Sequence, residues 1–242
     1  MKALKGIFAF NKNTLLLSAG IFIFFFYMSV FAFSEAPLLT AEMQAKMTPD
    51  DALTRLKAGN QRFVNNVPLP TNLIKKARLS AKGQYPSAVI LACMDSRIPT
   101  EIVFDQNIGN IFVTRVAANI ISDAILGGLE FATKVSGAKL IVVLGHDSCG
   151  AIKGACQNVQ LGHLTEVLAK IQPAIQKTKA TLKKQNCNDL DFINLAAKNN
   201  VRFVIKRIPK RSPIIQTLIK EGKIKIVGAM YHLSTGRVEF FE

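Results

Sequence analysis

The sequence predicts an α/β fold, in which a mainly parallel central β-sheet is flanked by helices and ends in a C-terminal β-hairpin. Short apolar runs alternate along the chain with longer segments of helical pattern, which is the order of β-α-β units. The runs at 88–92 and 140–144 are apolar throughout, as expected for strands buried on both faces of a parallel sheet. The last two runs are joined around Thr235 and Gly236, a composition that favours a hairpin.

The composition excludes several classes of protein. The 242 residues include 31 Lys and Arg against 16 Asp and Glu, a net charge of +15, and 49% are hydrophobic. The hydrophobic excess is concentrated near the N-terminus and the remainder mixes charges with periodic apolar runs, which excludes both a multi-span membrane protein and a disordered chain. Four cysteines in this length exclude a disulfide-framework miniprotein. Nucleic acid is not an expected partner, because the basic stretches lack interleaved aromatic residues.

The first 36 residues have the layout of an export signal. Three lysines within the first twelve residues precede an uncharged run at 15–33, and small residues follow. Cleavage after Ser34 or Ala36 satisfies the small-residue requirement of a signal peptide. The alternative is an uncleaved membrane anchor, since 19 mostly apolar residues nearly span a bilayer. Both interpretations place residues 37–242, as a single domain, in the periplasm or another compartment outside the cytoplasm.

In the first half of the domain, a helix start at Thr48 is the clearest local signal. A cap hydroxyl is followed by Pro49 and two acidic residues, which favour the positive end of a helix. The predicted elements are a helix from 48 to about 65, a polar connector over 66–85, a strand at 88–92, a short helix after Pro99 and a strand at 111–116.

The second half continues the alternation. Ser122 and Asp123 predict a helix that Gly137 ends, and Ser212 with Pro213 predicts another that runs to Glu221. Between them we expect a strand at 140–144 that runs into His146, and two or three helices over 150–208. The hairpin strands are predicted at 224–231 and 238–241.

Two polar clusters follow predicted strands. Cys93, Asp95 and Arg97 come after the first strand, and alternate residues of an extended segment project to the same side. His146 and Cys149 follow the run at 140–144 and lead into a helix, whose N-terminus favours a thiolate. Ligands gather at the carboxyl ends of parallel strands, so the two clusters are expected to meet. Two thiolates, one imidazole and one carboxylate form a tetrahedral set suited to Zn²⁺.

Each of these residues alone has a simpler interpretation. A buried cysteine is usually a small hydrophobic side chain, and Asp95 with Arg97 would pass for a surface ion pair. Their combination, in matching order at the ends of two strands, favours a metal site.

The residues also lie in motifs that resemble the β-class carbonic anhydrases, here in an exported bacterial form. The resemblance covers about residues 48–241. Its motifs are C-x-D-S-R from Cys93, F-D-Q at 104–106, I-F-V-T-R-V-A-A-N at 111–119, G-G-L-E-F-A at 127–132, L-G-H-D-S-C-G-A-I-K-G at 144–154, N-V-R at 200–202 and G-K-I-K-I-V-G-A-M-Y-H-L-S-T-G-R-V at 222–238.

The resemblance implies one Zn²⁺ per subunit, held by Cys93, His146 and Cys149. Asp95 would either complete the tetrahedron and exclude water or turn away to pair with Arg97, which makes both residues catalytic. In the second state zinc-bound hydroxide attacks CO2 to give bicarbonate and a proton, so the implied enzyme is a carbonate dehydratase (carbonic anhydrase, a lyase). Activity is then expected to fall in acid, which favours the Asp95-bound form.

The resemblance further implies a substrate pocket shared between subunits of a homodimer or homotetramer, which would dimerise through the sheet and the N-terminal helix. Gln84 would hydrogen-bond the substrate across the dimer interface, and Phe112 and Ala117 would line the CO2 pocket. By themselves, Phe112 and Ala117 would be ordinary strand core and Gln84 a loop residue. Ile90 replaces a tryptophan that some bacterial relatives use in a non-catalytic bicarbonate site, so that form of inhibition is not expected. Ala118 stands where glycine is common.

Other interpretations remain open on the sequence. A hydrolase of CS2 or COS would use the same ligands, and a non-catalytic zinc-binding envelope protein would use the ion only to join two strand ends. His163 and His232 are interpreted as surface or hydrogen-bonded histidines rather than proton shuttles. Cys156 and Cys187 form either a disulfide or two buried free thiols. The membrane is an expected partner only if the N-terminal segment is uncleaved.

Overall fold

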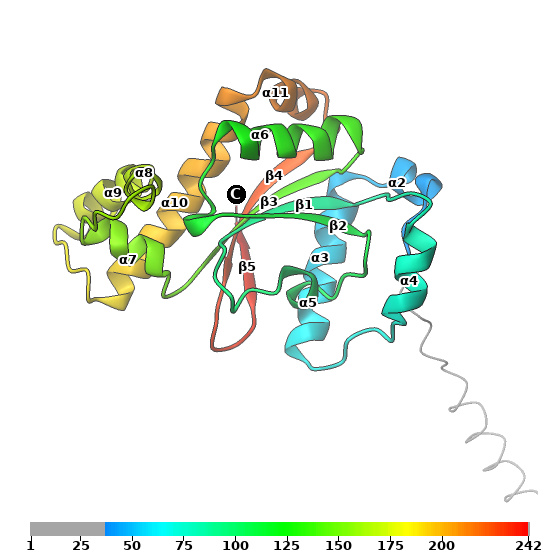
Figure 1. Ribbon diagram of the computed structural model, residues 1–242, viewed down its shortest axis with the longest axis horizontal. Helices are drawn as coiled ribbons and strands as arrows, with labels where there is room; N and C mark the ends of the chain where they lie inside the picture. Colours follow the sequence, from blue (N-terminus) through cyan, green and yellow to red (C-terminus); the bar gives the residue numbers. More distant parts are fainter. Residues whose placement is uncertain (1–36, 242) are drawn as a thin grey trace, which may run out of the picture. The chain divides into compact units, whose positions relative to one another are not determined.

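A five-stranded sheet in the order β2-β1-β3-β4-β5 forms the centre of the computed structural model, which describes residues 37–241. The first four strands are parallel, and β5 is antiparallel to β4. The strands are β1 (Ala88–Ala92), β2 (Ile111–Arg115), β3 (Leu140–His146), β4 (Lys225–Tyr231) and β5 (Val238–Phe241). The predicted α/β class, mainly parallel sheet and C-terminal hairpin are therefore confirmed (Figure 1). The predicted export signal lies outside the described residues.

The two central strands, β1 and β3, are buried along their whole length, which explains why their sequences are apolar without alternation. In the parallel register Ala92 lies opposite Leu144, so both strands deliver the chain to the same edge of the sheet. Cys93 leaves β1 there, and His146 is the last residue of β3. The sheet register thus brings together the two sequence clusters that were expected to meet.

In the part of the chain that the structure describes, three helices precede the sheet: α2 (Ala41–Lys46), α3 (Pro49–Val64) and α4 (Leu73–Ser80). The helix start at Thr48 is confirmed as a capping box, in which the Thr48 side chain accepts from the Asp51 N–H and the Asp51 carboxylate accepts from the Thr48 N–H at 2.9 Å. The polar connector predicted over 66–85 is wrong in part, because it contains α4. Asn72 caps that helix, and its side chain accepts from the Lys75 N–H at 2.9 Å.

The other helices lie between or after the strands. They are α5 (Thr100–Val103), the 3₁₀ turn η1 (Ala117–Asn119), α6 (Asp123–Glu130) with its π-helical extension η2 (Phe131–Val135), α7 (Gly150–Cys156), α8 (Leu164–Ala169), α9 (Gln172–Leu182), α10 (Leu190–Arg211) and α11 (Pro213–Lys220). The prediction of two or three helices over 150–208 was wrong, since four begin there. Short turns separate α7, α8 and α9, and Pro173, in the first turn of α9, marks the start of that helix.

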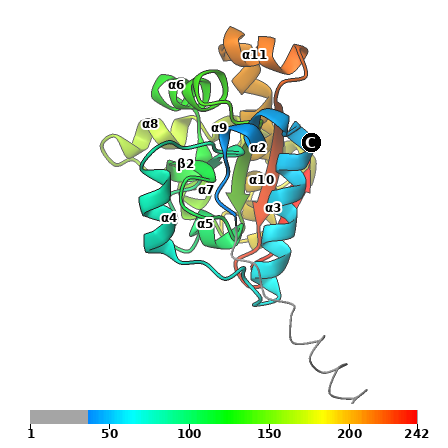
Figure 2. The ribbon, with the colours of Figure 1, turned by 90° about the vertical axis from the view of Figure 1, so that its right-hand side faces the viewer.

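The helices cover the sheet from several sides. In Figure 1, α7, α8 and α9 gather on one side of the sheet and α2, α3 and α4 on the other. Both views place α6 beside α11 (Figure 2), where Ser212 donates a hydrogen bond to Glu130 at 2.5 Å. The long helix α10 packs on β3 and β4, and Val201 lies so close to Gly145 and Gly228 that a Cβ on either glycine would collide with it. Within residues 37–241, no helix is both long and apolar enough to cross a bilayer.

Candidate metal centre

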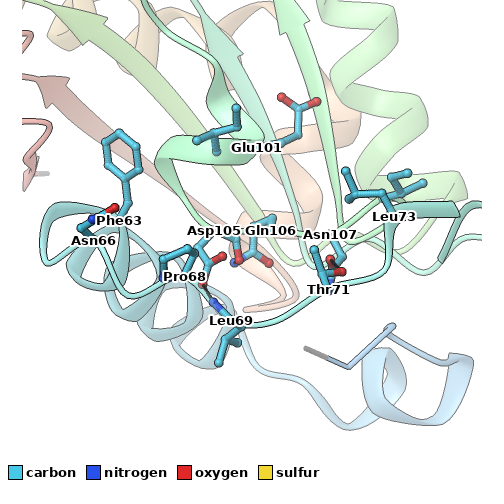
Figure 3. Close-up of a pocket in the computed structure, with 12 residues that line it drawn as sticks. Phe63, Asn66, Pro68, Leu69, Thr71, Leu73, Glu101, Asp105, Gln106 and Asn107 are labelled. Atoms are coloured by element: carbon cyan, nitrogen blue, oxygen red, sulfur yellow. Dashed lines mark hydrogen bonds between the residues drawn. The ribbon is translucent and has the colours of Figure 1, made fainter. Parts of the chain in front are cut away.

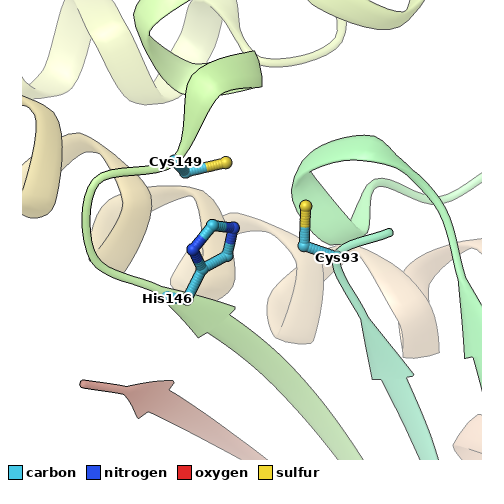
Figure 4. Close-up of side chains that lie close together, drawn as sticks. All are labelled: Cys93, His146 and Cys149. Atoms are coloured by element: carbon cyan, nitrogen blue, oxygen red, sulfur yellow. The ribbon is translucent and has the colours of Figure 1, made fainter. Parts of the chain in front are cut away.

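Three side chains that could bind a metal converge at the carboxyl edge of the sheet. Cys93 follows β1, His146 ends β3, and Cys149 caps the N-terminus of α7. One potential ligand atom from each residue lies within 4.8 Å of the other two, and all three residues are buried. Figure 4 shows the two sulfurs and the imidazole ring facing one another across this edge. The sheet therefore places two thiols and one imidazole around one common point.

The imidazole of His146 is oriented as a metal ligand. Its Nδ1 lies 2.8 Å from the backbone oxygen of Asp147, so Nδ1 carries the proton and Nε2 keeps a free lone pair. Within the described residues, Nε2 is buried and has no hydrogen-bond partner. A buried polar atom left unpaired is unfavourable, whereas a metal ion between Nε2 and the two sulfurs would satisfy it. Two sulfurs and one imidazole nitrogen match the donors that zinc prefers, so the residues present fit this ion.

The pKa values of the two cysteine side chains are shifted in opposite directions. The Cys149 thiol hydrogen-bonds Cys93, and this contact, against the opposing effect of burial, lowers the pKa of Cys93 to about 4. The Ala118 N–H also donates to the Cys93 sulfur at 3.3 Å. The same contact with the Cys93 thiolate, together with burial, raises the pKa of Cys149 well above its usual range. Without metal, the site therefore holds one thiolate and one thiol at neutral pH.

This unequal charge predicts how zinc binding depends on pH. Ligation needs both sulfurs as thiolates, and at pH 7 only Cys149 still carries a proton. Binding of Zn²⁺ to the metal-free chain should therefore release about one proton, and the apparent affinity should rise about tenfold per pH unit around neutrality. Isothermal titration calorimetry in two buffers of different ionisation enthalpy measures the proton count. Release of two protons would show that Cys93 is also a thiol, contrary to the expectation.

Asp95 is turned away from the three ligands and onto Arg97. The Arg97 guanidinium donates to both carboxylate oxygens, from Nε at 2.9 Å and from Nη2 at 2.8 Å, and the Arg97 N–H donates at 3.0 Å. These contacts hold the pKa of Asp95 well below its usual range. Oδ2 nevertheless remains 3.9 Å from Nε2 of His146. Of the two positions expected for Asp95, the structure has the arginine-paired one.

Arg115 was not singled out in the sequence. It ends β2, opposite Ala92 in the register, and its guanidinium donates to two backbone carbonyls of the neighbouring loop. Nε donates to the Cys93 oxygen at 3.0 Å, and Nη2 donates to the Asp95 oxygen. Arg115 therefore fixes the backbone that carries one thiolate and the carboxylate. An arginine at a strand end gives no signal of such a contact in the sequence.

The residues expected around the substrate lie at different distances from this edge. Ala117 is half-buried and precedes Ala118, whose N–H reaches the Cys93 sulfur. Ala118 has a positive φ of 54°, a backbone conformation that favours glycine, the residue that is common at this position. Phe112 is half-buried on β2 and packs edge-on against Phe131, with ring centroids 6.1 Å apart.

Gln84 is exposed and lies before the amino end of β1, whereas the three ligands lie at the carboxyl ends of the strands. A contact between Gln84 and a metal site therefore requires a second subunit.

The remaining residues noted in the sequence lie outside the cluster of Cys93, His146 and Cys149. Cys156 and Cys187 form a disulfide, which decides between the two alternatives left open for them. His163 is exposed, and His232 is partly exposed with its ring nitrogens 3.5 Å from an Asp147 oxygen and 3.7 Å from a Glu239 oxygen. A separate groove of about 500 Å³ contains none of the predicted site residues (Figure 3). Its apolar lining is Phe63, Pro68, Leu69, Leu73, Ile102 and Ile108.

The fold and this site define a class of protein: an α/β protein whose parallel sheet brings together, at its carboxyl edge, two cysteines and one histidine that could hold a metal ion. The family model described as carbonic anhydrase matches residues 88–238. The chain belongs to the β-class carbonic anhydrase family.

Relatives and solved structures agree with this assignment. A carbonic anhydrase of Mycolicibacterium smegmatis is 37% identical over 197 residues, covering 79% of this chain and 92% of the relative. Carbonic anhydrase 2 of Mycobacterium tuberculosis is 36% identical, covering 78% and 91%. The crystal structure of a tetrameric β-carbonic anhydrase from Sordaria macrospora matches with a TM-score of 0.62 at 26% identity, covering 68% of this chain and 85% of that one. The β-carbonic anhydrase CcaA shares the fold, with a TM-score of 0.65 at 22% identity and coverage of 78% and 95%.

Proposed function

We propose that this protein catalyses the zinc-dependent, reversible hydration of CO2 to bicarbonate and a proton. The observation that carries the proposal is the buried cluster of Cys93, His146 and Cys149, with a free lone pair on Nε2, beside a carboxylate that Arg97 holds aside. When bound, the zinc ion would supply a Lewis acid that lowers the pKa of a water ligand and makes it nucleophilic at neutral pH.

The chain's own residues would do the rest. Arg97 keeps the Asp95 carboxylate from occupying the position that water needs, and Arg115 fixes the loop on which Cys93 and Asp95 lie. Oδ2 of Asp95 is the carboxylate oxygen nearest to Nε2, so it is placed to accept a hydrogen bond from the attacking water. The half-buried Phe112 and Ala117 would supply an apolar surface for CO2, which has no charge to be recognised.

The test is stopped-flow CO2 hydration across pH, with zinc content measured on the same sample. About one zinc per chain together with CO2 hydration supports the proposal. A chain that binds zinc and releases sulfide from CS2 or COS, but does not hydrate CO2, would be a hydrolase on the same scaffold. A chain that binds zinc and turns over none of these substrates would be the non-catalytic envelope protein. Either result would overturn the proposal.

We also propose a homodimer or homotetramer whose sites are shared between subunits, because Gln84 lies at the opposite edge of the sheet from the ligands of its own chain. The Gln84→Ala variant and the Cys149→Ala variant should each, when assayed alone, have strongly reduced CO2 hydration activity. When the two variants are mixed under conditions that exchange subunits, half of random dimers are mixed, and one of their two sites has both residues. Activity should therefore recover to about a quarter of the wild-type value in subunit-exchange assays. No recovery would contradict a shared site.

We further propose that the protein acts outside the cytoplasm, in the periplasm or anchored at the membrane. The layout of the first 36 residues and the Cys156–Cys187 disulfide support this location, because disulfides persist in oxidising compartments. Cell fractionation with N-terminal sequencing of the protein distinguishes a cleaved signal from an anchor. An unprocessed chain in the cytoplasmic fraction would contradict the proposal.

A further inference from the structure

Helix α7 links the candidate metal centre to the disulfide. Cys149 caps its N-terminus, and Cys156 is its last residue. The backbone N–H groups of Ala151 and Ile152, in the first turn of the helix, act on the Cys149 thiol, where they oppose the rise in its pKa. The position of α7 therefore sets where this sulfur lies.

Both ends of α7 are attached to the beginning of α10. At the N-terminal end, the Ser148 N–H donates to Oδ1 of Asn194 at 2.8 Å, and Asn194 belongs to α10. At the C-terminal end, Cys156 is bonded to Cys187, which lies two residues before Asp189, the N-cap of α10. A seven-residue helix is only about 10 Å long, so a displacement at Cys156 is readily transmitted to Cys149.

The C-terminal end of α7 is held by the disulfide, by two hydrogen bonds and by the packing of the buried Ile152 and Ala155. Beyond the covalent bond, Gln185 donates to the Cys156 backbone oxygen at 3.2 Å, and Gln172 donates to the Ala155 oxygen at 2.8 Å. Gln185 lies in the same short segment as Cys187 and is exposed. Loss of the disulfide would free this segment and weaken the Gln185 contact as well.

We propose that Cys156 and Cys187 are positioning residues for the metal centre. Their disulfide keeps α7 in the position from which Cys149 can bind zinc. The inference rests on the proposed zinc site. It adds that zinc retention depends also on a disulfide that lies outside the ligand set. The disulfide is thus more than a general crosslink across the 31 residues that separate the two cysteines.

The test measures zinc release from the full chain into an excess of a chromophoric chelator. Cys156→Ala/Cys187→Ala should release zinc about 10- to 100-fold faster than wild type, the range typical when residues that orient metal ligands are lost. Asn194→Ala, which removes the attachment at the other end of α7, should also accelerate release. Leu218→Ala is the matched control, because it removes a buried side chain from α11, which carries none of the residues that attach α7 to α10. It should lower Tm while leaving zinc release near the wild-type rate.

Two results would overturn the inference: an unchanged release rate in the double variant, or equal acceleration in Leu218→Ala at a matched loss of Tm. If the double alanine variant does not fold, Cys156→Val/Cys187→Ala refills the buried position and decides the question. Cobalt substitution gives a second readout, since a displaced Cys149 sulfur would change the thiolate-to-cobalt absorption bands. A wild-type chain that binds no zinc would refute the proposed function itself, whereas identical release from zinc-loaded wild type and variant would refute only this inference.

Discussion

His146→Ala should abolish zinc retention and lower kcat/KM for CO2 hydration by at least about 1,000-fold, equivalent to about 4 kcal/mol of transition-state stabilisation. The imidazole is the one nitrogen donor of the cluster, and its Nδ1 contact with the Asp147 carbonyl already fixes Nε2 toward the sulfurs. Without it, the ion would be held by two thiolates alone. Zinc per chain is measured by atomic absorption, and activity by stopped-flow on the same preparation.

His163→Ala is the matched control, because His163 is exposed and is not one of the three clustered side chains. It should keep about one zinc per chain and wild-type activity. Circular dichroism must show that His146→Ala retains its helices, so that the loss reflects the site and not the fold. A folded His146→Ala chain that still binds one zinc and keeps more than about a tenth of the activity would show that the proposed ligand set is wrong.

The parts of the fold that the sequence predicted correctly are those with a local cause. The runs at β1 and β3 are apolar throughout because both strands are buried on both faces. Thr48 and Ser212 predicted helix starts because their hydroxyls cap N–H groups three residues further along the chain. Cys93 and His146 were expected to meet because the carboxyl ends of parallel strands share one edge.

Two kinds of feature were missed: a helix without a buried apolar face, and contacts between distant residues. Helix α4 exposes Leu73, Ile74 and Leu79, so it lacks the apolar face that predicts a buried helix. The contacts of Arg115 with Cys93 and of Asn194 with Ser148 span 22 and 46 residues, and no local pattern marks them.

Two alternatives were left open for the same reason. Whether Cys156 pairs with Cys187, and whether Asp95 pairs with Arg97, are questions of side-chain position that residue spacing does not answer.

Arg97→Ala should lower CO2 hydration at pH 7 by about 100-fold while zinc content stays near one per chain. In the structure three hydrogen bonds from Arg97 hold the Asp95 carboxylate, whose Oδ2 is only 3.9 Å from Nε2 of His146. Without the arginine, the carboxylate would be free to take the coordination position that water needs. Because Arg97 lowers the pKa of Asp95, its removal lets this pKa return toward the ordinary carboxyl range, so Asp95 would still be an anion at neutral pH.

The pH profile tests this explanation, because a structural role for Arg97 would not change it. Hydroxide competes better with the carboxylate as pH rises, so the activity deficit of Arg97→Ala relative to wild type should shrink between pH 7 and pH 9.

A double substitution gives a second test. Adding Asp95→Asn to Arg97→Ala should not lower activity further than Asp95→Asn alone, since the competing charge is then absent. Arg97→Lys keeps the positive charge but loses the paired contacts, and it should fall between Arg97→Ala and wild type. A deficit that is constant with pH, or strictly additive effects of the two substitutions, would mean that Arg97 does not act by holding Asp95 aside.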